Sequence, residues 1–155
     1  RSEPCGCGQR GCLERYASAT YMAEYAKRRI EETGHDGPLA RRLRDNGAID
    51  GRDINAARAD GDKIAAEAWD RLIDHLAVGC VNLCRIIDPD VIAIGGGLVQ
   101  AGDDLMAPLR EQFRRRHWDL TDVKTRIEPA ELGNAAGVIG AGAAAWDACG
   151  QNRET

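Results

Sequence analysis

Aromatic residues are scarce in this 155-residue sequence, at 5% of the chain, so a large aromatic core is excluded. No apolar run approaches the roughly 18 residues of a membrane-spanning helix, which excludes a membrane partner. The formal net charge is −4, so the chain also lacks the basic excess of nucleic-acid-binding domains. Glycine and alanine are abundant instead, and these small residues favour helices that pack closely together.

An initiator methionine and a secretory segment are also missing from the sequence. The length suits one domain or part of one, and we expect a fragment. Cys80, Cys84 and Cys149 fall in apolar helical stretches, where reduced core thiols are typical. These features together predict a cytoplasmic protein.

Three cysteines, Cys5, Cys7 and Cys12, lie within eight positions near the first residue. The glycines between them allow the tight turns that would bring three thiolates together. Zinc prefers tetrahedral thiolate and imidazole ligands, so this loop predicts a zinc site that needs a fourth ligand from elsewhere. A disulfide and plain buried cysteines are the alternatives, of which the second fits the polar and glycine neighbours poorly.

The spacing of apolar residues predicts helices in the middle of the chain. In the remainder it predicts strands that alternate with helices. Ala65, Trp69 and Leu72 begin a buried stripe on the longest helix, and Leu76, Cys80, Leu83 and Ile87 continue it. The second half of that helix is so apolar that we expect it to lie between other elements. The expected helices span 18–32, 38–45, 53–58, 62–87, 103–116 and a last stretch that ends near 149, and the expected strands span 91–94 and 124–128.

A glycine run, Gly95, Gly96 and Gly97, directly follows the first strand, which we expect to be buried on both faces. Backbone N–H groups of such a turn face the carboxyl edge of a sheet, where phosphates bind. The run lacks the lysine and hydroxyl residue of a Walker loop and is a weak signal by itself. A second small-residue turn, 133–137, precedes the last helix.

The segment from Cys5 to Glu14 resembles the signature of the ROK family, C-x-C-G-x-x-G-C-x-E, at every fixed position. This family contains sugar kinases, transcriptional repressors and uncharacterised open reading frames. The order of helices, strands and glycine turns is similar to the C-terminal half of the ROK kinases. The resemblance therefore covers nearly the whole chain, and it is closest to the glucokinases.

The resemblance implies an α/β fold, the C-terminal part of an actin-like (ribonuclease H-like) ATPase domain with a zinc-binding loop. The loop would span 5–14, the helical region 18–87 and the nucleotide side 91–148, all within a domain portion at 1–150. Residues 151–155 would be a disordered tail, and the N-terminal domain would be absent.

The resemblance also implies the ligands and the residues that bind them. Cys5, Cys7 and Cys12 would hold a structural Zn²⁺, whose fourth ligand would be an upstream histidine. Glu14 would accept a hydrogen bond from a sugar hydroxyl, with glucose the expected sugar. ATP, with Mg²⁺, would lie against the 95–97 run and Gly137.

In the family, the catalytic aspartate lies in the N-terminal half, so we expect no kinase activity from this chain alone. Two unpaired strand edges would favour a homodimer or pairing with further chain. A different alternative is the effector-binding domain of a ROK repressor, and a kinase for N-acetylhexosamines or fructose is a further alternative. The upstream sequence would distinguish a DNA-binding helix pair from a phosphate-binding hairpin.

Overall fold

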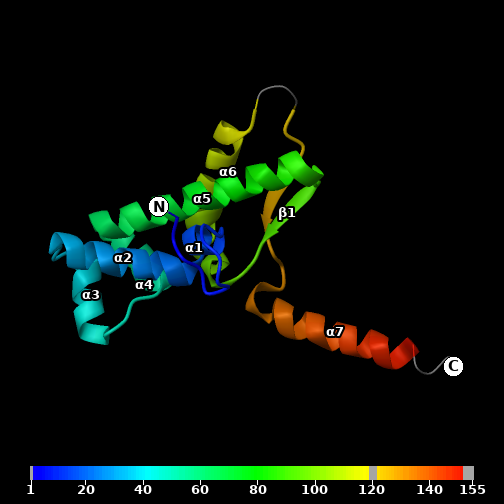
Figure 1. The fold of residues 1–155 in the computed structure, drawn as a ribbon, viewed down its shortest axis with the longest axis horizontal. Helices are drawn as coiled ribbons and strands as arrows, with labels where there is room; N and C mark the ends of the chain where they lie inside the picture. The colour runs from blue at the N-terminus through cyan, green and yellow to red at the C-terminus, as the bar shows by residue number, and fades with distance from the viewer. Residues whose placement is uncertain (1, 119–121, 152–155) are drawn as a thin grey trace.

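The computed structural model describes residues 2–118 and 122–151, which form a mixed α/β structure (Figure 1). None of the helices in these two stretches is long and apolar enough to cross a membrane. In chain order the elements are α1 (Glu14–Ala17), α2 (Ala19–Thr33), α3 (Pro38–Asn46), α4 (Gly51–Ala59), α5 (Lys63–Ile87), β1 (Val91–Ile94), the 3₁₀ helix η1 (Gly97–Ala101), α6 (Asp103–Arg116), β2 (Arg126–Pro129), the 3₁₀ helix η2 (Gly133–Ala135) and α7 (Ala136–Gln151).

The long helix α5 forms the centre of the fold (Figure 1). It contacts α2 and α4 from the first half of the chain and α6 from the second. Its buried Trp69 and Leu72 share one continuous core with Leu105 and Leu109 of α6. The apolar stripe predicted for this helix is therefore confirmed along its first two thirds.

The last turns of α5 are more exposed than predicted. Leu83 and Ile87, assigned to the buried stripe, are 44% and 65% exposed. Val78 and Ile86, expected between other elements, are 42% and 78% exposed. Within the described residues only the opposite face, which carries Cys84, is covered by neighbouring elements.

Most of the shorter helices begin and end at the residues that the sequence indicates. The Ser18 hydroxyl accepts a hydrogen bond from the Tyr21 N–H at the start of α2, and Gly34 ends the helix in the left-handed conformation. Pro38 begins α3 and Gly47 ends it. Helix α4 starts earlier than predicted because Asp50 forms a capping box with its first turn.

The N-terminus of α5 is fixed by Asp62, a carboxylate that is only 2% exposed. One oxygen accepts hydrogen bonds from the Ile64 and Ala65 N–H groups at 2.9 and 3.0 Å. The other accepts from the Leu39 N–H at 2.9 Å and lies 3.2 Å from His35 Nε2. His35 is therefore half-buried and packed against this carboxylate.

Stability should depend on pH through Asp62. Burial by itself would raise the pKa of this carboxyl, but the hydrogen bonds from Leu39, Ala65 and His35 outweigh it and hold the pKa below its ordinary value. The carboxylate therefore stabilises the fold above the ordinary aspartate pKa of about 3.9, and this contribution is lost as the pH falls through the lower folded-state value. We expect the stability difference between the native chain and Asp62→Ala to shrink from about pH 5 towards about pH 2, in acid-unfolding titrations. A constant difference across that range would contradict this account.

Strands β1 and β2 pair in parallel, with Ile92 opposite Ile127. Ile92 is buried, whereas Val91 and Ala93 are exposed, so β1 is covered on one face only. The prediction of a strand buried on both faces is therefore wrong for this chain, because the described residues place no layer over the second face. The second strand also begins two residues later than predicted, at Arg126.

The two outer edges of this small sheet differ. Asp90 and Ile94 accept hydrogen bonds from β2, so the backbone groups of Val91 and Ala93 point to the opposite edge. Within the described chain no strand pairs with that edge. On the other side, Arg110 Nε donates to the Ile127 carbonyl oxygen at 2.8 Å and occupies the outer edge of β2.

Helix α7 extends away from the rest of the structure (Figure 1). Its Val138 and Trp146 are 78% and 80% exposed. Cys149 on this helix is exposed, which corrects its assignment to the core, while Cys80 and Cys84 are buried as predicted. Gln151 ends the helix, and the remainder of the tail predicted to be disordered lies outside the described residues.

Candidate metal loop and ligand cavity

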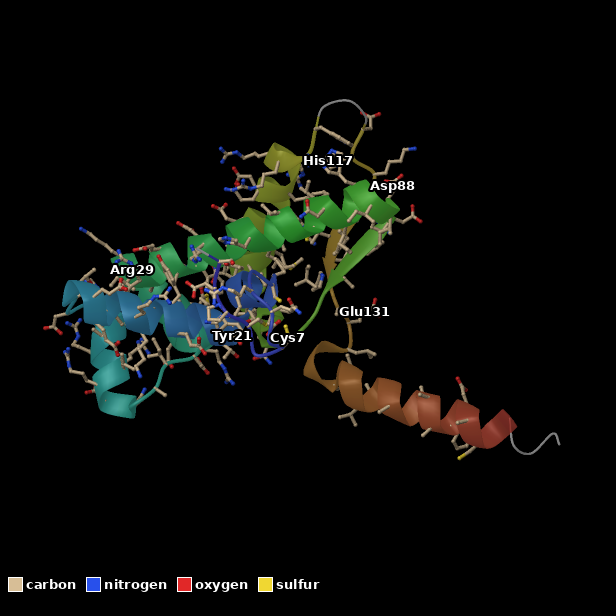
Figure 2. The ribbon with its side chains drawn as sticks, viewed as in Figure 1. Cys7, Tyr21, Arg29, Asp88, His117 and Glu131 are labelled. Atoms are coloured by element: carbon tan, nitrogen blue, oxygen red, sulfur yellow. The ribbon has the colours of Figure 1, made fainter. Side chains whose placement is uncertain are left out.

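The loop that carries the three N-terminal cysteines is a tight hairpin. Its ends form an antiparallel bridge between Pro4 and Arg10, and the Gly11 N–H donates to the Glu3 carbonyl oxygen at 2.9 Å. The tip turns through Gly8, whose φ is +87°, a value that side-chain-bearing residues rarely adopt. The loop lies near Tyr21 of α2 (Figure 2).

This hairpin brings the sulfur atoms of Cys5, Cys7 and Cys12 within 4.8 Å of one another. The Cys7 and Cys12 sulfurs are 3.6 Å apart, too far for a disulfide, and all three thiols are free. Tetrahedral zinc with bonds of about 2.3 Å to sulfur separates its ligands by about 3.8 Å, so the arrangement fits three of four zinc positions. Among the described residues, no histidine or further cysteine joins the cluster.

The three thiols do not share one environment. Hydrogen bonds from the Gln9 backbone and then from the Cys12 and Cys5 thiols hold the pKa of Cys7 below its ordinary value. Hydrogen bonding to the Cys7 and Cys5 sulfurs raises the pKa of Cys12 to about 11. The pKa values of Cys7 and Cys12 are therefore shifted in opposite directions, and a bound cation would have to deprotonate Cys12.

Glu14 follows this loop as the first residue of α1. Its side chain is exposed, and the Leu13 before it lies against Gly79 of α5. The candidate sugar-binding residue thus follows the candidate metal ligand Cys12 by two positions in the sequence. Glu14 does not line the cavity described next.

A cavity of about 430 Å³ lies between α4 and η1. Gly97 and Leu98 form one side, and Asn55, Ala59 and other residues of α4 form the opposite side. Gly51 brings the two sides together, because a Cβ there would lie 2.9 Å from a Leu98 methyl carbon. This volume is within the usual range for small-molecule sites.

Polar contacts with Asp104 hold two of the residues that line the cavity, Asn55 and Trp69. The Asn55 amide donates to Asp104 at 3.1 Å, and Arg58 forms an ion pair with it at 3.1 Å. These partners hold the pKa of Asp104 below its ordinary value. The Trp69 indole N–H donates to the Asp104 carbonyl oxygen, and the Arg58 guanidinium lies 5.3 Å from the Trp69 ring.

The structure separates the four glycines expected near a nucleotide. Gly95 directly follows β1, Gly96 has a φ of +93°, and Gly97 lines the cavity. The turn η2 contacts η1, so the ends of the two strands meet at one edge of the sheet. Gly137 lies in the first turn of α7 and is exposed, outside the residues that line the cavity.

Sequence reasoning missed the contribution of α4 to this cavity. The capping box at Asp50 and Asp53 marks the start of the helix, but it does not show which face meets η1. That face follows from packing between segments about 40 residues apart, which no local pattern reveals.

The family model described as ROK family matches residues 1–148. The chain belongs to the ROK family. The resemblance carried by the cysteine motif is therefore confirmed, and the ROK match extends through both glycine turns. It also accounts for the mixed α/β fold, that of the actin-like ATPases.

Among ROK relatives, the glucokinase of Halalkalibacterium halodurans is 34% identical over 139 residues, which are 90% of this chain and 42% of that protein. A ROK glucokinase from Streptomyces griseus, solved with glucose and AMPPNP, superposes with a TM-score of 0.75 at 31% identity. That match covers 90% of this chain and 46% of the solved one. The chain therefore spans less than half the length of these ROK glucokinases.

A ROK transcriptional regulator, a homologue of the Escherichia coli MLC protein, is also similar in structure. Its TM-score is 0.66 at 27% identity, over 83% of this chain and 31% of the regulator. Both functional classes of the ROK family are thus represented among the similar structures.

Proposed function

We propose that this chain is the nucleotide-binding part of an ATP-dependent sugar kinase that transfers the γ-phosphate of ATP to the 6-hydroxyl of glucose. The observation that carries the proposal is the match to the Streptomyces griseus glucokinase, whose structure contains glucose and an ATP analogue. The cavity at the carboxyl end of β1 supports it, because ligands of α/β proteins bind at this edge of a sheet.

We place the adenosine of ATP in the cavity between α4 and η1. Gly95 and Gly96 leave the turn without side chains, so its backbone N–H groups can approach the phosphates closely. Mg²⁺ would accompany these phosphates and neutralise part of their charge. Phosphoryl transfer also needs a base and both substrates in position, so we expect the nucleotide-binding part to bind ATP without turning it over.

For the cysteine loop we propose structural Zn²⁺ held by Cys5, Cys7 and Cys12. When bound, zinc cross-links the hairpin, since a site closed by a fourth ligand has no open position for chemistry. The rigid loop then holds Glu14 in the position where its carboxylate accepts a hydrogen bond from a sugar hydroxyl. A homodimer, expected from the unpaired strand edge, stays a prediction.

Filling the cavity should remove nucleotide binding. Ala59 lines the cavity and is exposed, so Ala59→Trp would occupy the space with little effect on the core. We expect Mg·ATP affinity, measured by isothermal titration calorimetry on the chain, to fall at least about tenfold, a loss of about 1.4 kcal/mol.

The matched control is Ala143→Trp on the exposed face of α7, which should bind Mg·ATP as the native chain does. If Ala59→Trp binds as well as the control, the nucleotide does not occupy this cavity. If the native chain binds glucose but no nucleotide, the second candidate, the effector-binding domain of a ROK transcriptional repressor, replaces the kinase proposal. The similarity to the MLC homologue favours that candidate over others.

A further inference from the structure

Helix α1 is a single turn of four residues, yet it carries Glu14 and follows Cys12 directly. The Arg15 N–H donates to the Cys12 carbonyl oxygen, and the Tyr16 and Ala17 N–H groups both donate to the Leu13 carbonyl oxygen, each at 2.9 Å. Cys12 therefore belongs to the same hydrogen-bonded turn as Glu14. Any shift of α1 relative to the rest of the molecule moves both residues.

Leu13 provides the first contact that holds this turn against α5. A Cβ at Gly79 would lie 2.7 Å from Leu13 Cδ2, with Cδ1 and Cγ at 3.5 and 3.7 Å. One side of Leu13, whose residue is 46% exposed, thus rests on the backbone of α5 at the one point where that helix has no side chain. Glycine lowers helix stability, so its presence in the interior of α5 fits a need for this close approach.

Tyr16 provides the second contact. Its ring stacks on His75 with centroids 4.9 Å apart and planes 17° from parallel, and the Arg71 guanidinium lies 5.4 Å from the ring. His75 Nδ1 lies 2.7 Å from the Arg71 carbonyl oxygen, which can only accept, so Nδ1 donates and fixes the ring orientation. The Tyr16 hydroxyl also accepts from the Glu3 N–H at 2.9 Å, at the start of the cysteine hairpin.

We infer that Gly79 and His75 of α5 are positioning residues, which set the location of the Cys12 sulfur and of the Glu14 carboxylate through Leu13 and Tyr16. The inference rests on the zinc and sugar roles proposed above. Both ends of the cysteine hairpin are tied to α5 in this way, the start through Glu3 and Tyr16 and the end through Leu13. Helix α5 thus acts as the rigid support of a short loop that has little core of its own.

The test compares Gly79→Ala with the native chain, using Co²⁺ as a spectroscopic probe of tetrahedral thiolate binding. We expect the Co²⁺ affinity to fall about tenfold, as for loss of other residues that support metal ligands. The thermal unfolding midpoint should be unchanged or higher, because alanine favours the helix more than glycine does. The matched control is Gly140→Ala in α7, where an added Cβ meets nothing within 4 Å and Co²⁺ binding should not change.

Two further variants, Leu13→Ala and the double variant Leu13→Ala/Gly79→Ala, complete a double-mutant cycle with Gly79→Ala and the native chain. If Leu13 and Gly79 act as one contact, the double variant loses no more affinity than the larger single loss. Losses that multiply, or native affinity in Gly79→Ala, would overturn the inference.

Hydrogen exchange in the metal-free chain separates this inference from the zinc proposal. The Arg15, Tyr16 and Ala17 amides should exchange faster in Gly79→Ala than in Gly140→Ala, whether or not the native chain binds metal. Failure of the native chain to bind Co²⁺ and Zn²⁺ would reject the zinc proposal alone, whereas unchanged exchange at these three amides would reject the positioning role.

Discussion

Replacing Asp62 by alanine is expected to lower the free energy of unfolding by about 3 kcal/mol. About half of this loss comes from the N-cap of α5, whose Ile64 and Ala65 N–H groups lose their acceptor. The remainder comes from the Leu39 N–H, which is buried with the carboxylate as its partner and would be left without one. Urea unfolding followed by circular dichroism measures the change.

Asp50 offers a matched control for this substitution, because it caps α4 with the same kind of backbone hydrogen bonds but is exposed. Water can replace its hydrogen bonds, so Asp50→Ala should cost only about 1 kcal/mol. Equal losses in the two variants would show that the burial of Asp62 contributes nothing beyond the cap.

Replacing Cys12 by serine is expected to abolish stable zinc binding. The native chain should contain about one zinc per molecule after purification, and the variant almost none, by elemental analysis. The reason is that loss of a direct thiolate ligand should exceed the roughly 10–100-fold effect of losing a residue that only supports a ligand. Because the hairpin has few other contacts, the variant should also lose protection of the loop against proteolysis.

Cys149→Ser is the control, since Cys149 is an exposed cysteine on α7 outside the three-sulfur cluster. It should retain the native zinc content. Zinc that is absent from the native chain, with all its thiols reactive, would contradict the metal assignment. Zinc that is lost equally from both variants would show nonspecific binding by free thiols.

Local features of this chain could be predicted from its sequence because their causes are local. The spacing of Cys5, Cys7 and Cys12, with glycines between them, predicts a tight loop in which the thiols converge. The recurrence of apolar residues every three or four positions around Trp69 and Leu72 predicts the buried face of α5. In both cases the neighbouring residues in the sequence are also the neighbours that determine the structure.

Features that depend on distant contacts could not be predicted in this way. An apolar strand such as Val91–Ile94 does not reveal whether a second layer will cover it, and here Val91 is exposed. The contact of His35 with Asp62 joins residues 27 positions apart, and the cavity joins α4 to η1. Hydrophobic patterns show which side chains favour burial, but they do not show which element buries them.

The Arg110 guanidinium on the outer edge of β2 determines the direction in which this sheet can grow. Because Arg110 already donates to the Ile127 carbonyl oxygen, the outer side of β2 is blocked and β2 stays an edge strand. A further strand would therefore join beside β1. Such an addition, from a second copy or from further chain, would place Gly95 and its turn between strands instead of at the margin. A single arginine side chain on a helix would thereby place the glycine turn in the interior of any larger sheet that this pair of strands joined.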